Sequence, residues 1–186
     1  MKCCAGCEWL PTGYHGTLKS NVEGILKEGK FHHSRKSYEW LGFGVYFFKH
    51  EAFAAWWADM QVNNKLKNTG EKDSSAVLCA DLFFSKNQLL DLDDPDQLDA
   101  LNEFIDDYIK KTPKYSKIWN TSKEKERWCL ACNLYRRINK DIKVICLTFR
   151  TSAPRNRKNT GSFPKSQFQY CISDDSIINN IRQEVI

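Results

Sequence analysis

The hydrophobic and polar positions of the chain follow two periods, that of a strand and that of a helix, without an obvious linker between the segments. The run VLCADL at residues 77–82, for example, alternates between two faces in the way that is typical of a β-strand. Short apolar runs bounded by turn residues extend this interpretation. The predicted strands are residues 12–17, Val45–Phe48, Ala76–Phe84, Lys143–Phe149 and Phe168–Ile172.

Apolar residues at helical spacing, together with end signals, predict helices between these strands. The N-terminal cap of the first helix is predicted at Ser20 or Asn21, and Gly29 lies just beyond the end of this helix. Phe31–Trp40 gives no clear signal, and the polar run Asn63–Ser75 is interpreted as a surface loop. The predicted helices are Ser20–Lys27, Glu51–Asn63, Pro95–Lys111, Ser122–Ile138 and a closing helix at Ser176–Val185.

Length and composition bound the organisation of the chain. With 186 residues, of which 41% are apolar, the chain can bury one substantial core, so we expect a single domain over residues 1–186. We find neither a signal-peptide pattern nor an apolar run of the roughly 18 residues that a membrane span needs. We therefore expect a soluble, cytoplasmic protein that does not enter a membrane.

Eight cysteines raise the question of disulfides or a metal site. Cys3, Cys4 and Cys7 cluster at the start, and Cys129 and Cys132 form a CxxC pair inside a predicted helix. Neither group has a second pair at zinc-ribbon spacing, nor a HxxxH partner. We expect reduced thiols and no metal.

Charge is distributed in two blocks, although the net charge of +5 is mild. Eight acidic residues and no basic residue lie between Lys86 and Lys110, which is typical of a solvated helix face. Between Asp141 and Asp174 the charged residues are all basic. Much of this second block lies in a loop containing Pro, Gly, Ser and Asn, where the charges are expected to be exposed.

One motif gives the sequence a specific interpretation. HGTLKSNVEGILKEG at residues 15–29, followed by GFGVYF at residues 42–47, resembles the ADP-ribosyltransferase superfamily in its poly(ADP-ribose) polymerase-like and diphtheria-toxin-like branch. The first part of the family pattern is matched without a gap, and the matched positions of both parts occur in the family order. These positions are His15, Gly16, Asn21, Gly24, Ile25, Leu26, Gly29, Gly42, Gly44, Tyr46 and Phe47.

The resemblance implies an α+β fold with a split antiparallel β-sheet core, flanking helices and a cleft for NAD, which is a co-substrate. His15 is then expected to bind the adenosine ribose, with Gly16 and Thr17 beside it. The Gly16 backbone is expected to approach the nicotinamide carboxamide, where a side chain would obstruct it. Tyr46 is expected to stack on the nicotinamide ring, and Trp57 stands where the family often has a second stacking tyrosine.

The third functional position of the family usually carries glutamate at the start of a late strand. The residue that stands there is Gln169, and Gln167 points the same way along the strand. A glutamine can hydrogen-bond a ribose hydroxyl, but it has no charge to stabilise a cation and cannot act as a base. We therefore expect transfer of a single ADP-ribose rather than chain elongation. The alternative is that the true third residue lies elsewhere.

The loop before Gln169 is expected to contact the acceptor. Cations for phosphates and an aromatic ring for base stacking favour a nucleic acid, RNA or DNA, and a protein acceptor is the alternative. The predicted acceptor-binding residues are Arg155, Arg157, Lys158, Phe163 and Lys165.

Three functions follow from these observations. The first is a mono-ADP-ribosyltransferase, a pentosyltransferase acting as an intracellular toxin or antiviral effector, with an antitoxin or inhibitor protein as a possible partner. The second is a catalytically silent module that binds NAD, ADP-ribose or nucleic acid. The third is an unrelated basic nucleic-acid-binding domain in which the motif is a coincidence.

Overall fold

The computed structural model describes residues 8–150 and 166–184 and shows a mixed α/β protein. Its helices are α1 (Lys19–Glu28), α2 (Glu51–Thr69), α3 (Pro95–Lys111), α4 (Pro113–Thr121) and α5 (Glu124–Ile138). Its strands are β1 (Glu8–Trp9), β2 (Thr12–Leu18), β3 (Val45–Phe48), β4 (Ser75–Leu82), β5 (Phe84–Ser85), β6 (Leu89–Asp91), β7 (Val144–Arg150), β8 (Ser166–Ile172) and β9 (Ile178–Gln183). Two short 3₁₀ turns, Lys86–Gln88 and Asp175–Ile177, precede β6 and β9.

Seven of these strands form one sheet in the order β6-β7-β8-β3-β2-β4-β9. Neighbouring strands are antiparallel except for β6 and β7, which are parallel. Strands β2 and β3 are in register at one residue pair, Tyr14 opposite Phe48, whereas β2 and β4 are paired along the whole of β2. The centre of the sheet therefore has one weakly paired junction, between β2 and β3.

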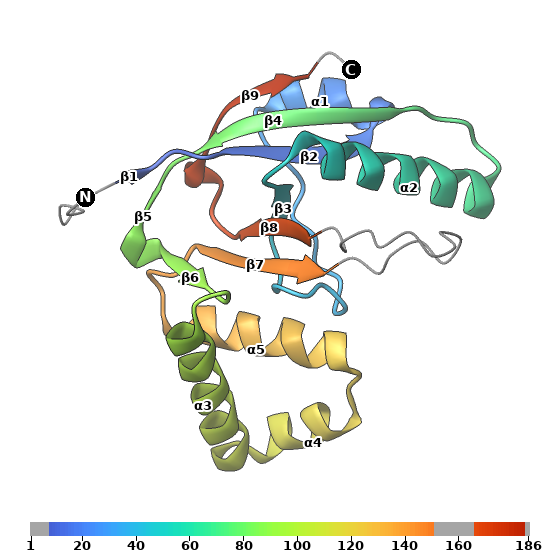
Figure 1. Ribbon diagram of the computed structural model, residues 1–186. Coiled ribbons are helices and arrows are strands. Elements are labelled where there is room, and N and C mark those ends of the chain that lie inside the picture. The colour runs from blue at the N-terminus through green and yellow to red at the C-terminus, as the bar shows by residue number, and fades with distance from the viewer. Residues whose placement is uncertain (1–7, 151–165, 185–186) are drawn as a thin grey trace, which may run out of the picture.

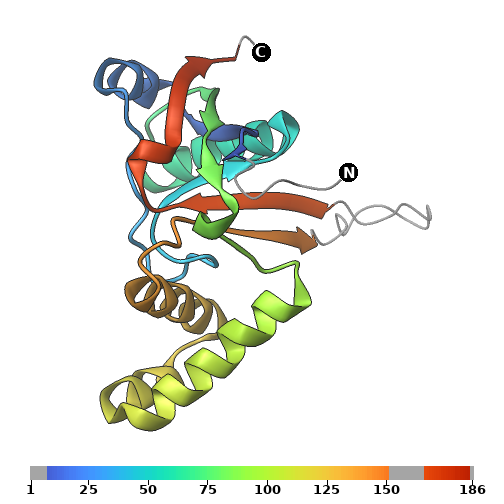
Figure 2. The ribbon, with the colours of Figure 1, turned by 90° about the vertical axis from the view of Figure 1, so that its left-hand side faces the viewer.

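The two faces of the sheet are covered differently (Figures 1 and 2). One face packs against α1, which contributes Val22 and Ile25 to the larger core. On the other face, α2 packs on β2, β3 and β4 through Ala54, while α3 and α5 pack near β6, β7 and β8 through residues such as Leu101 and Cys132. Helices α3, α4 and α5 form a group at the β6 end of the sheet.

Several predicted elements are confirmed. Strand β3 and helix α3 have the predicted bounds, because a short buried run and a proline at the helix start are strong signals. Gly29 adopts the left-handed conformation (φ 64°) at the end of α1. The predicted cap of α1 is wrong, since the helix begins at Lys19. Its first N–H groups are satisfied from another loop, by the Ser74 carbonyl and the Asp73 carboxylate.

Two predictions about α2 and the region after α3 need correction. The polar run Asn63–Ser75 is helical up to Thr69, because its polar residues form the solvated side of α2 and not a loop. Gly70 ends the helix.

Helix α4 was not predicted, because the proline that opens it follows α3 almost directly and Lys111 is only two residues before it.

The predicted closing helix at Ser176–Val185 is wrong. This segment forms the second 3₁₀ turn and then β9, which pairs with the outer edge of β4. Ile178 and Ile181 both pack against the larger core, a three-residue spacing that favours a helix when it is read from sequence. The register shift between Cys79 and Asp81, and the left-handed Asn180 (φ 52°), give the strand this irregular spacing.

Candidate NAD cleft

A cleft of about 740 Å³ lies beside the junction of β2 and β3. It is within the size range of small-molecule sites. The cleft is lined by residues from β2, α1, the 31–44 loop, β3, α2, the start of α5, the end of β7 and the start of β8. The structure brings together all of the sequence-predicted NAD-site residues here: His15, Gly16, Thr17, Tyr46, Trp57 and Gln169.

The side chain of His15, a residue of β2, reaches the backbone of β3. Its Nδ1 donates a hydrogen bond of 2.8 Å to the backbone carbonyl of Tyr46. The ring packs against Phe31 and Phe47, with centroid distances of 4.8 and 5.8 Å. Burial lowers the pKa of His15 below its ordinary value, and the bond to Tyr46 only partly opposes this shift. The ring is therefore neutral at pH 7, and because Nδ1 carries the proton, Nε2 is a hydrogen-bond acceptor.

The Tyr46 side chain is fixed at its hydroxyl by the backbone of Leu41 and Gly42. Its hydroxyl donates to the Gly42 carbonyl at 2.8 Å and accepts from the Leu41 N–H at 3.0 Å. Burial, followed by the nearby Cys171 thiol and the Glu39 carboxylate, raises the pKa of Tyr46 far above its ordinary value. The phenol is therefore neutral and held in one position, and Tyr46 lines the cleft. We call His15 and Tyr46, with the Leu41–Gly42 turn, the His15 wall.

The Leu41–Gly42 turn is held in place from behind by α5. Gly42 is left-handed (φ 84°) and lies against Asn133. Arg136 is buried and donates to the Phe43 carbonyl at 2.8 Å and to the Cys171 carbonyl at 2.7 Å. This arginine joins α5 to the turn and to β8, so the sequence motif depends on a residue outside it.

Gly16 lines the cleft, but the expected reason for its small size is incomplete. A Cβ at this position would lie 2.0 Å from the Ala54 carbonyl oxygen of α2, so the absence of a side chain permits the contact between β2 and α2. The Gly16 carbonyl accepts a hydrogen bond of 2.9 Å from Gln61 Nε2. Gln61 was not predicted from the sequence, because a helical glutamine gives no signal of a partner in a distant strand.

Helix α2 contributes two tryptophans to the lining of the cleft. Trp56 and Trp57 are 47% and 44% exposed, and both line the cleft. Ala54 and Ala58, on the buried side of the same helix, face the sheet. Trp57 is therefore not a core residue. Thr17 is buried and accepts a hydrogen bond from Asn21 Nδ2, which links the cleft to α1.

Gln169 and Gln167 lie on one side of β8 and both line the cleft, as the alternation of the strand predicted. Gln169 lies opposite Phe48 of β3 and Leu147 of β7. The side-chain Oε1 of Gln167 is buried and has no hydrogen-bond partner among the residues that the structure describes. We call these two residues, with Leu147 and Phe149 opposite them on β7, the Gln169 wall.

The charged residues of the cleft were not predicted as site residues. The cleft is lined by two lysines, Lys36 and Lys125, and by Glu39. Among the described lining residues, Glu39 is the only one with a carboxylate. Glu39 accepts a hydrogen bond from Ser34 Oγ at 2.6 Å. The segment Phe31–Trp40 that carries Lys36 and Glu39 is mostly irregular, with one bridge between Ser34 and Gly44. Its sequence therefore gave no periodic signal.

The predicted acceptor-binding residues Arg155, Arg157, Lys158, Phe163 and Lys165 lie outside the described residues, as do Cys3, Cys4 and Cys7. The cysteines that the structure describes, Cys79, Cys129, Cys132, Cys146 and Cys171, are buried and free. Within residues 8–150 and 166–184, no group of three His, Cys, Asp or Glu side chains is placed to hold a metal ion. No helix in the described part of the chain is long and apolar enough to cross a bilayer.

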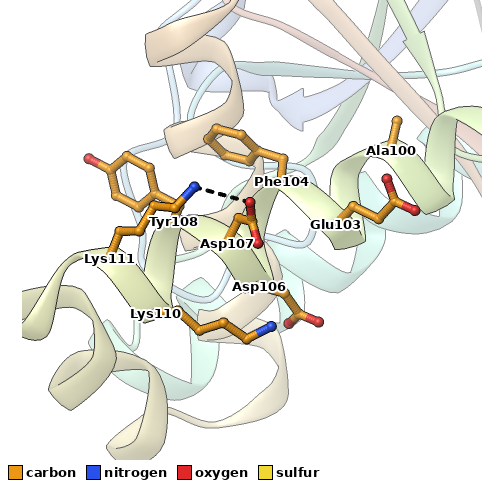
Figure 3. Close-up of a pocket in the computed structure, with 8 residues that line it drawn as sticks. All are labelled: Ala100, Glu103, Phe104, Asp106, Asp107, Tyr108, Lys110 and Lys111. Atoms are coloured by element: carbon orange, nitrogen blue, oxygen red, sulfur yellow. Dashed lines mark hydrogen bonds and ion pairs between the residues drawn. The ribbon is translucent and has the colours of Figure 1, made fainter.

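A second hollow lies on α3, away from the cleft (Figure 3). It is lined by acidic residues that the sequence placed on a solvated helix face, and Glu103, Asp106 and Asp107 are indeed exposed. Asp107 forms an exposed ion pair with Lys111 at 3.2 Å, one helical turn away. Such a pair contributes little to stability, and the hollow shares no lining residue with the cleft.

No protein-family model, curated protein or solved structure matches the chain.

Proposed function

We propose that the protein is a mono-ADP-ribosyltransferase with an ADP-ribosyltransferase-like fold, which cleaves NAD and transfers ADP-ribose to a nucleic acid. The observation that carries this proposal is that one cleft gathers His15, Tyr46, Trp57 and Gln169 from four separate elements. Two of these residues come from the motif that resembles the superfamily, and the other two stand at positions outside the motif that the same resemblance assigns. The weak β2–β3 junction supports the split sheet that this family has.

The donors and acceptors of the cleft suit NAD. The two aromatic surfaces, Tyr46 and Trp57, offer stacking to a flat nicotinamide ring. The neutral His15 offers Nε2 to a ribose hydroxyl, and Lys36 supplies positive charge for a diphosphate. Gln169 offers an amide oxygen to the hydroxyl of the second ribose.

In the proposed reaction, the bond between the ribosyl carbon and the nicotinamide nitrogen breaks, and nicotinamide leaves with the electron pair. The acceptor nucleophile then attacks the cationic ribosyl carbon and loses its proton to solvent. The fixed His15 wall orients the ribose and the ring before the bond breaks, which reduces the entropic barrier. Gln169 supplies a hydrogen bond but no charge, so the rate is expected to be low.

The test begins with purified protein and NAD labelled in its adenylate, incubated with separate pools of RNA, single-stranded DNA and cell protein. We expect release of nicotinamide and label in RNA or DNA. His15→Ala is expected to abolish both. The matched control is His50→Ala, because His50 is exposed and lies outside the cleft. A folded sample that neither consumes NAD nor labels a pool contradicts the proposal, and label in protein alone contradicts the nucleic-acid part.

A paired substitution tests the third position. Gln169→Glu places a carboxylate beside the ribosyl carbon and is expected to raise nicotinamide release by about tenfold or more. Glu39→Gln removes the carboxylate that already lines the cleft. If Glu39→Gln abolishes turnover while Gln169→Glu leaves the rate unchanged, Glu39 and not Gln169 is the third residue.

Two observations favour a second function, that of a catalytically silent module that binds NAD or ADP-ribose. Gln169 has no charge, and the carbonyl of Gly16, whose backbone is expected to approach the carboxamide of the ligand, is already bonded to Gln61. Calorimetry with NAD and ADP-ribose distinguishes the two functions. Binding without nicotinamide release supports the silent module. Gln61→Ala then frees the carbonyl and is expected to tighten NAD binding.

The cellular role follows from the enzymatic proposal. If the protein is a toxin or antiviral effector, its induced expression is expected to arrest growth of a host cell, and His15→Ala is expected to restore growth. Equal growth arrest by both proteins contradicts that role.

A further inference from the structure

A group of side chains in the cleft has no part in the NAD site proposed above. Trp40 precedes the Leu41–Gly42 turn, Phe149 lies at the end of β7, and Lys125 lies in the first turn of α5. The ring centroids of Trp40 and Phe149 are 5.9 Å apart, and Lys125 Nζ lies 5.1 Å from the centroid of Trp40. With Gln167, all three line the cleft. We call these four residues the Trp40 cluster.

Gln167 gives this cluster a polar group without a partner. It lies opposite Phe149 in the β7–β8 ladder, so the two side chains are neighbours on one face of the sheet. Its Oε1 is buried and accepts no hydrogen bond from the described residues. A buried acceptor without a donor destabilises a protein, and such groups are uncommon in native structures. A ligand with an N–H group can supply the missing donor.

The position of the cluster along β8 is suited to an acceptor. Gln167 is two residues from Gln169 on the same side of the strand, a separation of about 7 Å. Tyr46, which lies opposite Cys171, is two residues further in the other direction. A group that bonds to Gln167 Oε1 therefore lies next to Gln169, on the side of Gln169 away from Cys171.

We propose that the Trp40 cluster is the acceptor subsite and that it binds an unpaired nucleobase of RNA or single-stranded DNA. This inference rests on the proposed function, since it assigns the acceptor of the same cleft. The two rings offer stacking surface, which every base can use. Lys125 meets the phosphate attached to that base, and Gln167 Oε1 accepts an N–H from the edge of the base. An acidic peptide would use the cation and could donate to the amide oxygen, but its carboxylates would not use the two rings.

The experiment measures binding of fluorescein-labelled single-stranded decamers by anisotropy, at one fixed salt concentration. The probes are dA10, its RNA counterpart and an abasic decamer that carries the same number of phosphates. We expect dA10 or the RNA decamer to bind about tenfold more tightly than the abasic decamer, because stacking requires bases. Comparison of the two base-containing probes distinguishes DNA from RNA.

Variants separate the roles within the cluster. Trp40→Leu and Gln167→Leu are expected to weaken binding of the base-containing decamers several-fold and to leave the abasic decamer unchanged. Lys125→Ala is expected to weaken binding of all three decamers and to reduce their salt dependence. Lys125 is exposed, so this variant is expected to fold even if Trp40→Leu does not. The matched control is Lys114→Ala, an exposed lysine on α4 outside the cleft.

NAD binding by thermal shift and nicotinamide release are measured on the same variants. Base-dependent binding that is lost in the cluster variants supports the subsite. If the wild-type protein neither binds nor cleaves NAD, that result contradicts the proposed function but leaves the subsite standing. Equal binding of dA10, the RNA decamer and the abasic decamer overturns the inference. Label transfer to protein that is unchanged by Trp40→Leu or Gln167→Leu overturns it as well.

Discussion

The His15 wall and the Gln169 wall face the same cleft, but their polar groups are in opposite states. On the His15 wall, the ring nitrogen Nδ1 of His15 and the hydroxyl of Tyr46 are bonded to backbone, and Arg136 fixes the adjoining turn. On the Gln169 wall, Gln167 presents a buried oxygen without a described partner. The first wall is organised before any ligand arrives. The second has a polar group that a ligand can satisfy, so changes in the two walls are expected to affect stability and binding differently.

The largest effect is expected from Gly16→Ala. The new Cβ would lie 2.0 Å from the Ala54 carbonyl oxygen, so β2 or α2 must shift. We expect the free energy of unfolding to fall by about 3 kcal/mol or more in urea denaturation. The control is Gly24→Ala in α1, where a Cβ meets nothing within 4 Å and helix propensity favours alanine. A Gly16→Ala protein as stable as Gly24→Ala would show that α2 does not restrict β2.

A smaller loss is expected when the support behind the His15 wall is removed. Arg136→Met leaves the Phe43 and Cys171 carbonyls without their donor, and we expect a loss of about 2 kcal/mol in urea denaturation. The neighbouring Arg137 is exposed, so Arg137→Met is the matched control and is expected to change stability by less than about 0.5 kcal/mol. Equal losses would mean that the buried arginine does not hold the turn.

The direct test of the comparison removes one polar group from each wall. Tyr46→Phe deletes a hydroxyl with two backbone partners, and we expect a loss of about 1 kcal/mol. Gln167→Leu deletes an amide whose oxygen is buried and unpaired, and we expect no loss of stability, or a gain. Thermal denaturation of both variants without ligand measures the difference. The contrast between the walls fails if Gln167→Leu is the more damaging change.

The smallest effect is expected from the titration of His15. Burial lowers its pKa in the folded protein below the ordinary value of 6.5, so the unfolded chain binds the proton first as the pH falls. The free energy of unfolding therefore decreases below about pH 6.5 and is unaffected by this group above that pH. Denaturation at pH 7.5 and 5.5 is expected to show a larger decrease for the wild type than for His15→Gln. Equal decreases would mean that His15 titrates normally.

The sequence predicted the parts of the fold and site that depend on local patterns. Val45–Phe48 is a short buried run, and Gln167 and Gln169 alternate with apolar residues, so the strand and the side that these glutamines face followed directly. The bond from Gln61 to Gly16 could not be predicted, because it joins residues 45 apart in the sequence and no spacing rule connects them. Strand β9 was missed for a related reason, since its irregularity depends on its pairing with β4.

The sheet order has a consequence for synthesis of the protein. The cleft requires β8 beside β3, and the contact between Cys171 Sγ and the Gly42 carbonyl joins residues 129 apart in the sequence. Contacts of such high sequence separation form late, after the intervening chain is available. A nascent chain that ends before β8 has the whole motif of residues 15–47 but only one side of the cleft. We therefore expect ribosome-bound chains to lack a complete cleft until residue 172 has emerged.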